Sequence, residues 1–169
     1  MRIPIFFGES REICPCPECQ SPLKHRDYRL RIMKLDGGVK KILRVERLQC
    51  TNEGCRRIHN ALPDCLTPYK HYASEVISGV LDEIITPDDL EDEDYPCEAT
   101  MLRWKHWLMV NYVRIDGYLK SIGHRLLGFD QRLLESRISL LEKIRLSNDC
   151  WLEAILRMIY NSGGFLVPS

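Results

Sequence analysis

Apolar and polar residues alternate along two neighbouring stretches near the start of the chain, residues 28–35 and 39–48. Alternation with a period of two is typical of β-strands. Asp36-Gly37-Gly38 separates the stretches and is a turn signal, because glycine adopts positive φ without strain. The pattern therefore predicts a two-stranded β-hairpin in the first third of the chain.

Beyond residue 66 the apolar period changes to about 3.6, which is typical of α-helices with one buried face. Thr67-Pro68 is a helix start signal and predicts a helix over 67–84. The predicted buried face of this helix consists of Tyr69, Ala73, Val76, Ile77 and Val80. Thr86-Pro87 predicts a short helical turn to residue 90. Further helices are expected over 96–127, with breaks near Gly117 and Gly123, over 131–146 and over 150–160. Trp104 and Trp107 are expected in the core.

Two pairs of cysteines stand at the two ends of the predicted hairpin, in a C-x2-C and a C-x4-C arrangement. Zn²⁺ is commonly bound by four thiolates in a tetrahedron, with two ligands from each of two tight turns. Cys14 is close enough to compete for a ligand position, and His59 is an alternative to Cys55. The predicted zinc ligands are Cys16, Cys19, Cys50 and Cys55.

The chain has 24 basic and 24 acidic residues, so its net charge of zero carries no argument for nucleic-acid binding. The charge is unevenly distributed, however, because residues 1–72 and 100–169 are net basic and residues 73–99 contain no Lys or Arg. The acidic run 91–94 is expected in a solvated loop, with a partner-binding or metal-binding role as the alternative.

The N-terminal residues contain no apolar run long enough for a signal peptide, and no stretch approaches the ~18 apolar residues of a membrane span. We therefore expect a cytoplasmic protein without membrane contact, in which paired cysteines more often bind metal than form disulfides. The remaining cysteines Cys65, Cys97 and Cys150 are expected to be small buried residues.

Several short motifs follow one another along the chain: Leu48-Gln49-Cys50, Cys55-Arg56-Arg57-Ile58-His59, Pro68-Tyr69-Lys70-His71-Tyr72 and Thr100-Met101-Leu102-Arg103-Trp104-Lys105. Together with the cysteine ribbon they resemble the zinc-ribbon plus helix-turn-helix N-terminal region of bacterial insertion-sequence transposases. They resemble still more closely a family of short bacterial proteins of unknown function that keep only this region. The resemblance covers roughly residues 14–108, and the acidic insert 88–94 departs from it.

The residue patterns predict an α+β fold, with a zinc-ribbon β-hairpin over 1–66, helices with an acidic insert over 67–110 and a C-terminal helical unit over 111–169. The resemblance implies that the helices over 67–110 are helix-turn-helix-like. It also implies double-stranded DNA as the partner, with Thr100, Arg103, Lys105 and His106 facing it from the second helix. From the residues themselves, phosphate contacts are expected from ribbon and post-ribbon arginines, because Lys and Arg neutralise phosphates. These arginines are Arg29, Arg31, Arg44, Arg56 and Arg57, to which Lys40 and Lys41 are added.

The sequence offers little support for catalysis, because it has no Gly-rich phosphate loop and no nucleophile elbow. A redox role for the C-x2-C pair is disfavoured, since no βαβ pattern follows it. We therefore expect a protein that is not an enzyme. The alternative to DNA binding is a zinc-stabilised protein-interaction module, in which the C-terminal helices and the acidic loop bind a protein partner.

Overall fold

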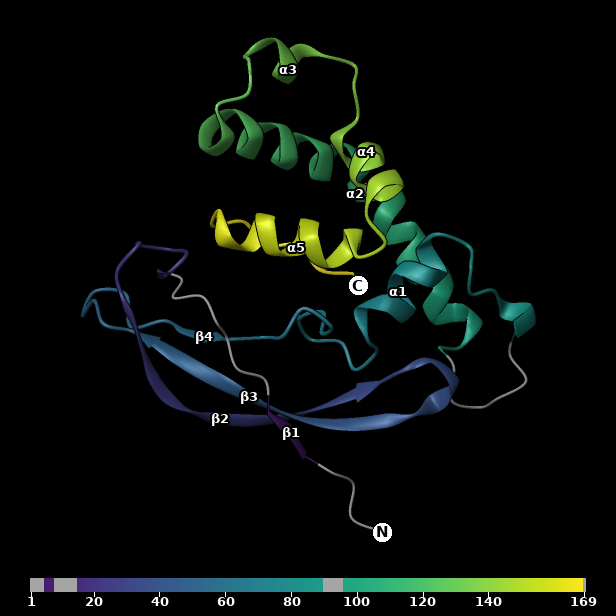
Figure 1. The fold of residues 1–169 in the computed structure, drawn as a ribbon, viewed down its shortest axis with the longest axis horizontal. Helices are drawn as coiled ribbons and strands as arrows, with labels where there is room; N and C mark the ends of the chain where they lie inside the picture. Colours follow the sequence, from purple (N-terminus) through teal and green to yellow (C-terminus); the bar gives the residue numbers. More distant parts are fainter. Residues whose placement is uncertain (1–4, 8–14, 90–95, 169) are drawn as a thin grey trace. The chain divides into compact units, whose positions relative to one another are not determined.

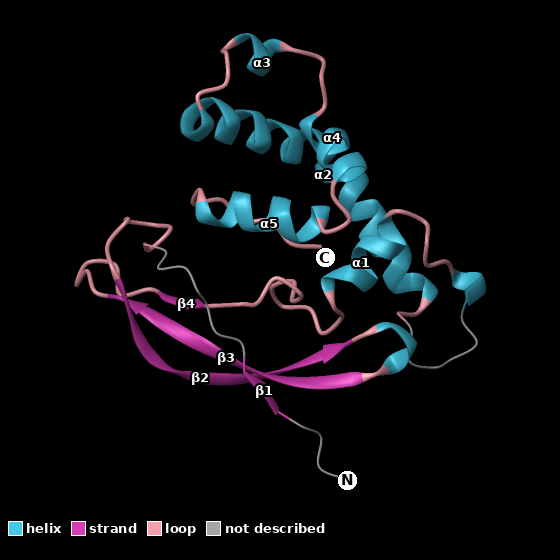
Figure 2. Cartoon of the chain, in the orientation of Figure 1, coloured by secondary structure: helices cyan, strands magenta, loops and turns pink. Residues whose placement is uncertain are grey.

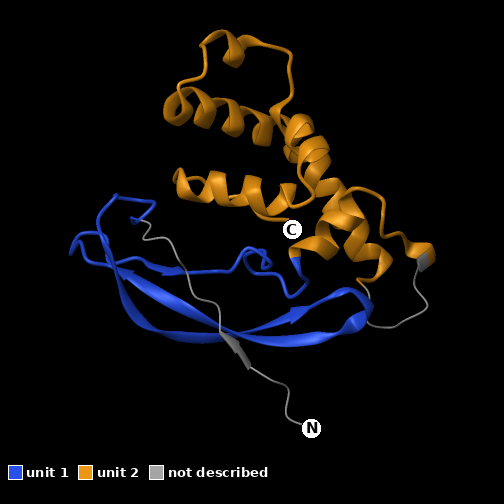
Figure 3. Cartoon of the chain, viewed as in Figure 1, with its two compact units in different colours: residues 1–73, 92–95 blue, residues 74–91, 96–169 orange. Residues whose placement is uncertain are grey.

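A computed structural model describes residues 5–7, 15–89 and 96–168 of the chain. The fold is α+β, with a sheet in the N-terminal part followed by helices (Figure 1). The chain divides into two compact units (Figure 3). The first contains residues 1–73 and 92–95, and the second contains residues 74–91 and 96–169. Cys14 and the acidic run 91–94 lie outside the described residues.

The first unit is built on a long β-hairpin of β2 (Leu23–Lys34) and β3 (Lys40–Cys50), which pair antiparallel along their length (Figure 2). The turn Asp36–Gly38 joins them, and Gly37 and Gly38 both have positive φ, as the sequence predicts. The opposite edge of β3 is shared by two short strands. β1 (Ile5–Phe7) pairs parallel with its first half, and β4 (Ile58–Asn60) pairs antiparallel with its last residues.

One side of this hairpin is buried and the other is not. Met33, Leu43 and Val45 have almost no exposed surface. The apolar residues of β2 that point to the other face, Tyr28 and Leu30 among them, are exposed. The hairpin is therefore apolar on both faces, although only one of them contributes to the core.

The first helix of the second unit, α1, spans Ser74–Leu81, which corrects the predicted start at residue 67. Residues before it are held by the sheet, because the Lys34 amide donates to the His71 carbonyl and the Ala73 amide donates to the Lys34 carbonyl. Tyr69 has a φ of 62° and is exposed, so it lies outside the helix and its buried face. The helix ends early because the backbone of Glu83 adopts the left-handed conformation. Backbone amides next to it donate hydrogen bonds to carbonyls of the last helical turn, as is typical of a helix C-terminus. The predicted positions Ala73, Val76, Ile77 and Val80 are buried.

After a 3₁₀ turn at Pro87–Asp89, the long helix α2 runs without interruption over Glu98–Leu127. The expected breaks at Gly117 and Gly123 do not occur. A side chain at Gly123 would collide with the Phe129 ring, so this glycine allows the chain after the helix to fold back closely. Gly128, with a φ of 67°, ends the helix. The predicted boundary between residues 110 and 111 falls inside α2, and the structure places both sides in one unit.

The predicted helix over 131–146 is two helices, α3 (Arg132–Glu135) and α4 (Leu140–Ser147). α5 (Trp151–Asn161) follows, close to its predicted bounds. Buried side chains from α1, α2, α4 and α5 form the core of the unit, and the predicted burial of the two tryptophans of α2 is confirmed. Large side chains that are fully buried include Trp104, Trp151, Ile77, Met101, Ile115, Leu141, Leu152 and Ile155.

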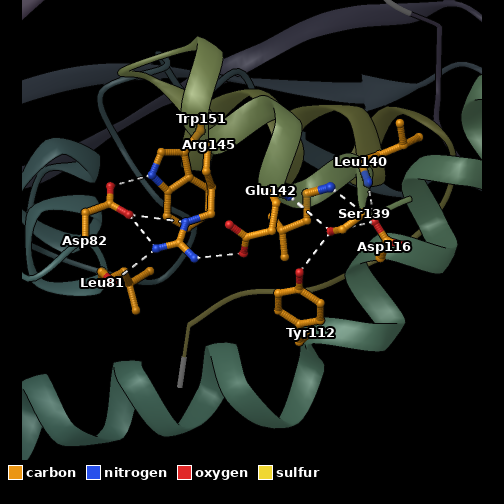
Figure 4. Close-up of polar contacts among 10 residues, drawn as sticks. Leu81, Asp82, Tyr112, Asp116, Ser139, Leu140, Glu142, Arg145 and Trp151 are labelled. Atoms are coloured by element: carbon orange, nitrogen blue, oxygen red, sulfur yellow. Dashed lines mark hydrogen bonds and ion pairs between the residues drawn. The ribbon is translucent and has the colours of Figure 1, made fainter. Parts of the chain in front are cut away.

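Two partly buried sets of polar contacts tie these helices together (Figure 4). Asp82, just after α1, accepts hydrogen bonds from Arg145 Nη2 at 2.6 Å and from Trp151 Nε1 at 2.7 Å. Asp116, in the middle of α2, accepts from the amide nitrogens of Leu140 and Leu141 at 2.6 and 3.1 Å. The first contact joins α1 to α4 and α5, and the second joins α2 to the start of α4.

None of the helices within the described ranges is both long enough and apolar enough to cross a membrane.

Candidate metal centre

The first unit brings together the sulfur atoms of Cys16, Cys19, Cys50 and Cys55, which all lie within 4.8 Å of one another. Cys16 and Cys55 are separated by 3.8 Å between sulfurs, and Cys19 and Cys50 by 3.4 Å. With a Zn–S bond of 2.3 Å, a tetrahedron places its sulfurs about 3.8 Å apart. The four cysteines could therefore hold one metal ion without rearrangement of the backbone.

The first cysteine pair sits on a tight turn that its own backbone closes. The Gln20 amide donates to the Cys16 carbonyl, and the Cys16 amide donates to the Ser21 carbonyl, both at 2.8 Å. Gln20, directly after Cys19, has a φ of 60°. This left-handed residue reverses the chain, so that both sulfurs point to the same side of the turn.

The second pair uses the same turn, although its spacing is longer. The Arg56 amide donates to the Asn52 carbonyl at 2.9 Å, and Arg56 has a φ of 45°. Asn52 thus occupies the position that Cys16 has in the first turn, and its side chain accepts from the Gly54 amide. The missing ligand comes instead from Cys50, the last residue of β3. The C-x4-C spacing is therefore the C-x2-C turn with its first cysteine moved back onto a strand.

The two turns are held together by the hairpin itself. Leu23 at the start of β2 pairs with Cys50 at the end of β3. Thr51 donates both its amide and its hydroxyl to the Pro22 carbonyl, at 3.0 and 2.9 Å. The register of the hairpin therefore determines where the sulfurs meet.

His59 lies beside the cluster and is not one of its four members. It is on β4, is buried, and its Nε2 is 3.4 Å from the Cys16 sulfur. Burial lowers the pKa of His59, so the ring is neutral at pH 7. With its proton on Nε2, it would donate a hydrogen bond to the Cys16 thiolate and orient that ligand.

The environment of the sulfurs sets which of them ionises first. The hydroxyl and amide of Ser21 lower the pKa of Cys19 to about 6. Burial raises the pKa of Cys50 to about 12. The Arg57 amide lowers the pKa of Cys55, but burial and the neighbouring sulfurs outweigh it, so this pKa lies above its usual value. Cys19 is therefore available to a cation as a thiolate before Cys50 and Cys55, from which metal binding would displace protons.

The arginines predicted to contact phosphates have different surroundings in the first unit. Arg56 and Arg29 are exposed, and Arg57 forms an ion pair with Glu18 at 3.3 Å. Arg31 is half-buried and donates to the Lys70 carbonyl at 2.8 Å. In addition, the Arg44 guanidinium lies 3.8 Å from the centre of the Tyr28 ring.

The residues predicted to face DNA from α2 do not share one face. Arg103 and His106 are exposed, and Arg103 donates to the Thr100 hydroxyl at 2.9 Å. Lys105 pairs with Glu83 at 3.1 Å. Residues two apart are separated by about 200° around an α-helix, so Arg103 and Lys105 lie on opposite flanks.

The expected burial of Cys65, Cys97 and Cys150 is wrong, because all three are exposed. Cys97 and Cys150 occupy the residues just before α2 and α5, where a helix begins at the surface. The Thr100 hydroxyl lowers the pKa of Cys97.

Sequence reasoning missed the roles of Ser21 and Asn52 at the cluster. Two signals were available in the sequence: Ser21 stands two positions after the C-x2-C pair, and Asn52 stands three positions before the second cysteine of the C-x4-C pair. A family model described as Domain of unknown function (DUF6431) matches residues 16–104 of the chain. No curated protein and no solved structure matches the chain significantly.

Proposed function

The chain belongs to the DUF6431 family of domains of unknown function, and we propose that it is a zinc-stabilised DNA-binding protein that is not an enzyme. The matched residues begin at Cys16 and contain the whole four-cysteine cluster. A closed tetrahedral set of four thiolates favours zinc over Mg²⁺ or Ca²⁺, which prefer oxygen ligands. Such a site leaves no open position for a substrate, so its role is structural.

The observation that carries the DNA-binding proposal is the state of Arg103 near the start of α2. Its guanidinium is exposed and is held by the Thr100 hydroxyl and the Ala99 carbonyl. No carboxylate among the described residues pairs with it. An exposed, positioned arginine without an acidic partner suits bidentate contact with guanine in a major groove. His106 is exposed one turn further along the helix and is the second candidate reader.

Phosphate contacts in this proposal come from the first unit, which is the more basic one. Arg56 follows the ligand Cys55 directly, so a bound metal would fix the backbone that presents it. Arg29 is exposed on β2, whereas Arg57, next to Arg56, is exposed but paired with Glu18 and is the weaker candidate. Lys105 and Arg31 are less suitable, because the first is paired with Glu83 and the second is half-buried. The motif resemblance further suggests that the DNA-binding protein is either transposase-related or a transcriptional regulator.

The test is a titration of a fluorescent duplex of random sequence, at low salt and again at physiological salt. We expect binding that weakens with salt, because phosphate contacts release counterions. Arg56→Ala should lower the slope of log affinity against log salt by about one. Arg103→Ala should reduce discrimination between a selected site and random DNA by about 1–3 kcal/mol.

Arg137→Ala is the matched control, because Arg137 is exposed in the second unit and the substitution removes the same charge. It should leave site discrimination unchanged. Absence of binding to any duplex at low salt would contradict the proposal.

A second candidate function, a zinc-stabilised protein-interaction module, is favoured by a different observation. The outer side of α2 carries a row of exposed apolar side chains, namely Leu102, Met109, Val110 and Val113, of which Val113 is 81% exposed. A row of this kind on one helix is more typical of a surface that contacts protein than of one facing phosphates. If no duplex binds, this candidate takes precedence, with the C-terminal helices as the interaction surface.

A further inference from the structure

The outer edge of β2 offers free backbone groups to an additional strand. At its last residue, the Lys34 amide and carbonyl both point away from β3, since they bond to His71 and Ala73. The register with β3 is unbroken from Asp27 to Lys34, so the backbone groups of alternate residues point the same way. Tyr28, Leu30 and Ile32 therefore direct their N–H and C=O groups outward, where no hydrogen bond from another described residue meets them.

This edge already accepts an extended segment at one end. Tyr72 forms a parallel bridge with Lys34, and the Lys34 ammonium lies 5.2 Å from the centre of the Tyr72 ring. The bridged segment does not continue along β2, because its preceding residues turn at Thr67 and Lys70. The part of the edge from residue 28 to residue 32 thus remains available.

The side chains at this open edge form an apolar row on one face. Tyr28, Leu30 and Ile32 are 48%, 57% and 46% exposed and, at alternate positions, share that face. On β3 the row is extended only by Ile42, opposite Ile32, because Leu30 and Tyr28 are opposite Arg44 and Glu46. Apolar residues of an added strand would therefore find apolar neighbours on β2 itself.

The other face of the same edge carries two arginines that have no acidic partner among the described residues. Arg29 is opposite Val45 and Arg31 is opposite Leu43, so β3 supplies no carboxylate to either. Arg31 Nη2 donates to a carbonyl, but its Nε is buried and has no hydrogen-bond partner in the described part of the chain. Burial, and then the charge of Arg29, lower the pKa of Arg31. Carboxylates placed on the open side would neutralise this pair.

We propose that the edge of β2 binds an extended peptide from a protein partner, which adds to the sheet as a further strand. The peptide is apolar at the positions beside Tyr28, Leu30 and Ile32, and acidic at the intervening positions that face Arg29 and Arg31. Backbone bonds supply the affinity and the alternating side chains supply the specificity. This surface is separate from the residues assigned to DNA, except for Arg29.

A second copy of the chain fits this edge less well. Antiparallel self-pairing about Leu30 would place Arg29 of one copy directly opposite Arg31 of the other. Like charges in directly opposed positions destabilise a strand pair. The arginines therefore select an acidic strand and disfavour a dimer through this edge.

The test uses a fluorescent decapeptide of alternating Val and Glu, with an alternating Val and Lys peptide as its counterpart, and fluorescence anisotropy as the readout. The full chain should bind the Glu peptide and bind the Lys peptide at least about tenfold more weakly. Arg29→Glu should weaken the Glu peptide and strengthen the Lys peptide. Equal binding of the two peptides by the unmodified chain, or binding of neither, would overturn the proposal.

Leu30→Pro tests the backbone contact, because it removes an N–H that points outward and takes no part in pairing with β3. It should weaken the Glu peptide by about tenfold or more, whereas Leu30→Ala, which keeps the N–H, should weaken it less. Unchanged metal content in both variants shows that the first unit is folded. Should Leu30→Pro instead dissociate a dimer seen by sedimentation, the occupant is a second copy and the peptide proposal is wrong.

Discussion

Replacement of Asp116 by alanine is expected to destabilise the second unit substantially. Asp116 and its partner Lys120 are nearly buried, with side chains 12% and 13% exposed and an N–O distance of 3.0 Å. The carboxylate also caps α4, because it accepts from two backbone amides and from the Ser139 hydroxyl. The substitution would leave the amides of Leu140 and Leu141 and the Lys120 ammonium without this acceptor.

The expected decrease in the free energy of unfolding has two parts, the loss of the helix cap and the loss of the ion pair with Lys120. Loss of a helix cap costs about 1 kcal/mol. A nearly buried ammonium without its carboxylate costs about 3 kcal/mol, at the low end for broken buried pairs because Lys120 keeps the Ser136 carbonyl. Since the two effects share one side chain, we expect a total of about 3–4 kcal/mol and a Tm lower by roughly 10 °C.

Urea denaturation followed by tryptophan fluorescence measures this loss, because Trp104, Trp107 and Trp151 all lie in the second unit. Glu135→Ala, which removes an exposed carboxylate from α3, is the control and should change the unfolding free energy by less than about 0.5 kcal/mol. If Asp116→Ala unfolds at the same urea concentration as the control, the capping argument is wrong.

The same variant should show a defined pH dependence. Burial alone would raise the pKa of Asp116, but hydrogen bonds from Leu141, Lys120 and Leu140 outweigh it, so the pKa lies below its usual value. A carboxyl with a lowered pKa stabilises the fold above its ordinary pKa and loses this effect as the pH falls through the folded value. The difference in stability between the unmodified chain and Asp116→Ala should therefore shrink below about pH 4.

Three further predictions concern the same unit. Asp82→Asn removes the charge that binds Arg145 and Trp151 and should cost about 2 kcal/mol in urea denaturation; an unchanged midpoint would show that this contact is not stabilising. Val76→Asp places a charge at a position only 2% exposed and should cost about 4 kcal/mol or prevent folding, as seen by circular dichroism. Burial raises the pKa of Glu153, whose Oε2 accepts no hydrogen bond from any residue within the described ranges, so its ionisation at neutral pH opposes folding. Glu153→Gln should therefore raise the Tm at pH 7 and have little effect near pH 4, and a lower Tm at pH 7 would count against this reading.

The sequence was most informative where local pattern and chemistry coincide. Period-two alternation and the Gly37-Gly38 turn predicted the hairpin, and the structure has both. The paired cysteines were expected to meet, and they do, because hairpin register alone brings the two turns together. In both cases the decisive interactions are close in sequence or fixed by one hairpin.

The errors arose where distant residues decide the local structure. Thr67-Pro68 is a good helix start in isolation, but residues 71 and 73 are bound to Lys34 of β2, which delays the helix to Ser74. The division between α3 and α4 depends on Asp116, more than twenty residues earlier in the chain. The sequence Ser139-Leu140-Leu141-Glu142 did contain a capping-box signal for the second helix, which the longer apolar pattern concealed.

The candidate DNA-contacting residues show a related limit. Sequence alone cannot tell an exposed arginine from one that is partly buried, as Arg31 is against the Lys70 carbonyl. It also did not reveal that Lys105 would find an acidic partner in Glu83. Both outcomes depend on how segments far apart in the chain pack within a unit.

Metal analysis of the purified chain tests the central claim most directly. We expect one zinc ion and no iron per chain, retained in Cys65→Ser, whose cysteine is exposed and outside the cluster. Cys50→Ser should lose the metal, and His59→Gln should keep it, because His59 lies beside Cys16 without belonging to the four. Full zinc occupancy in Cys50→Ser, or a chain that takes up no zinc after reduction and reconstitution, would contradict the account.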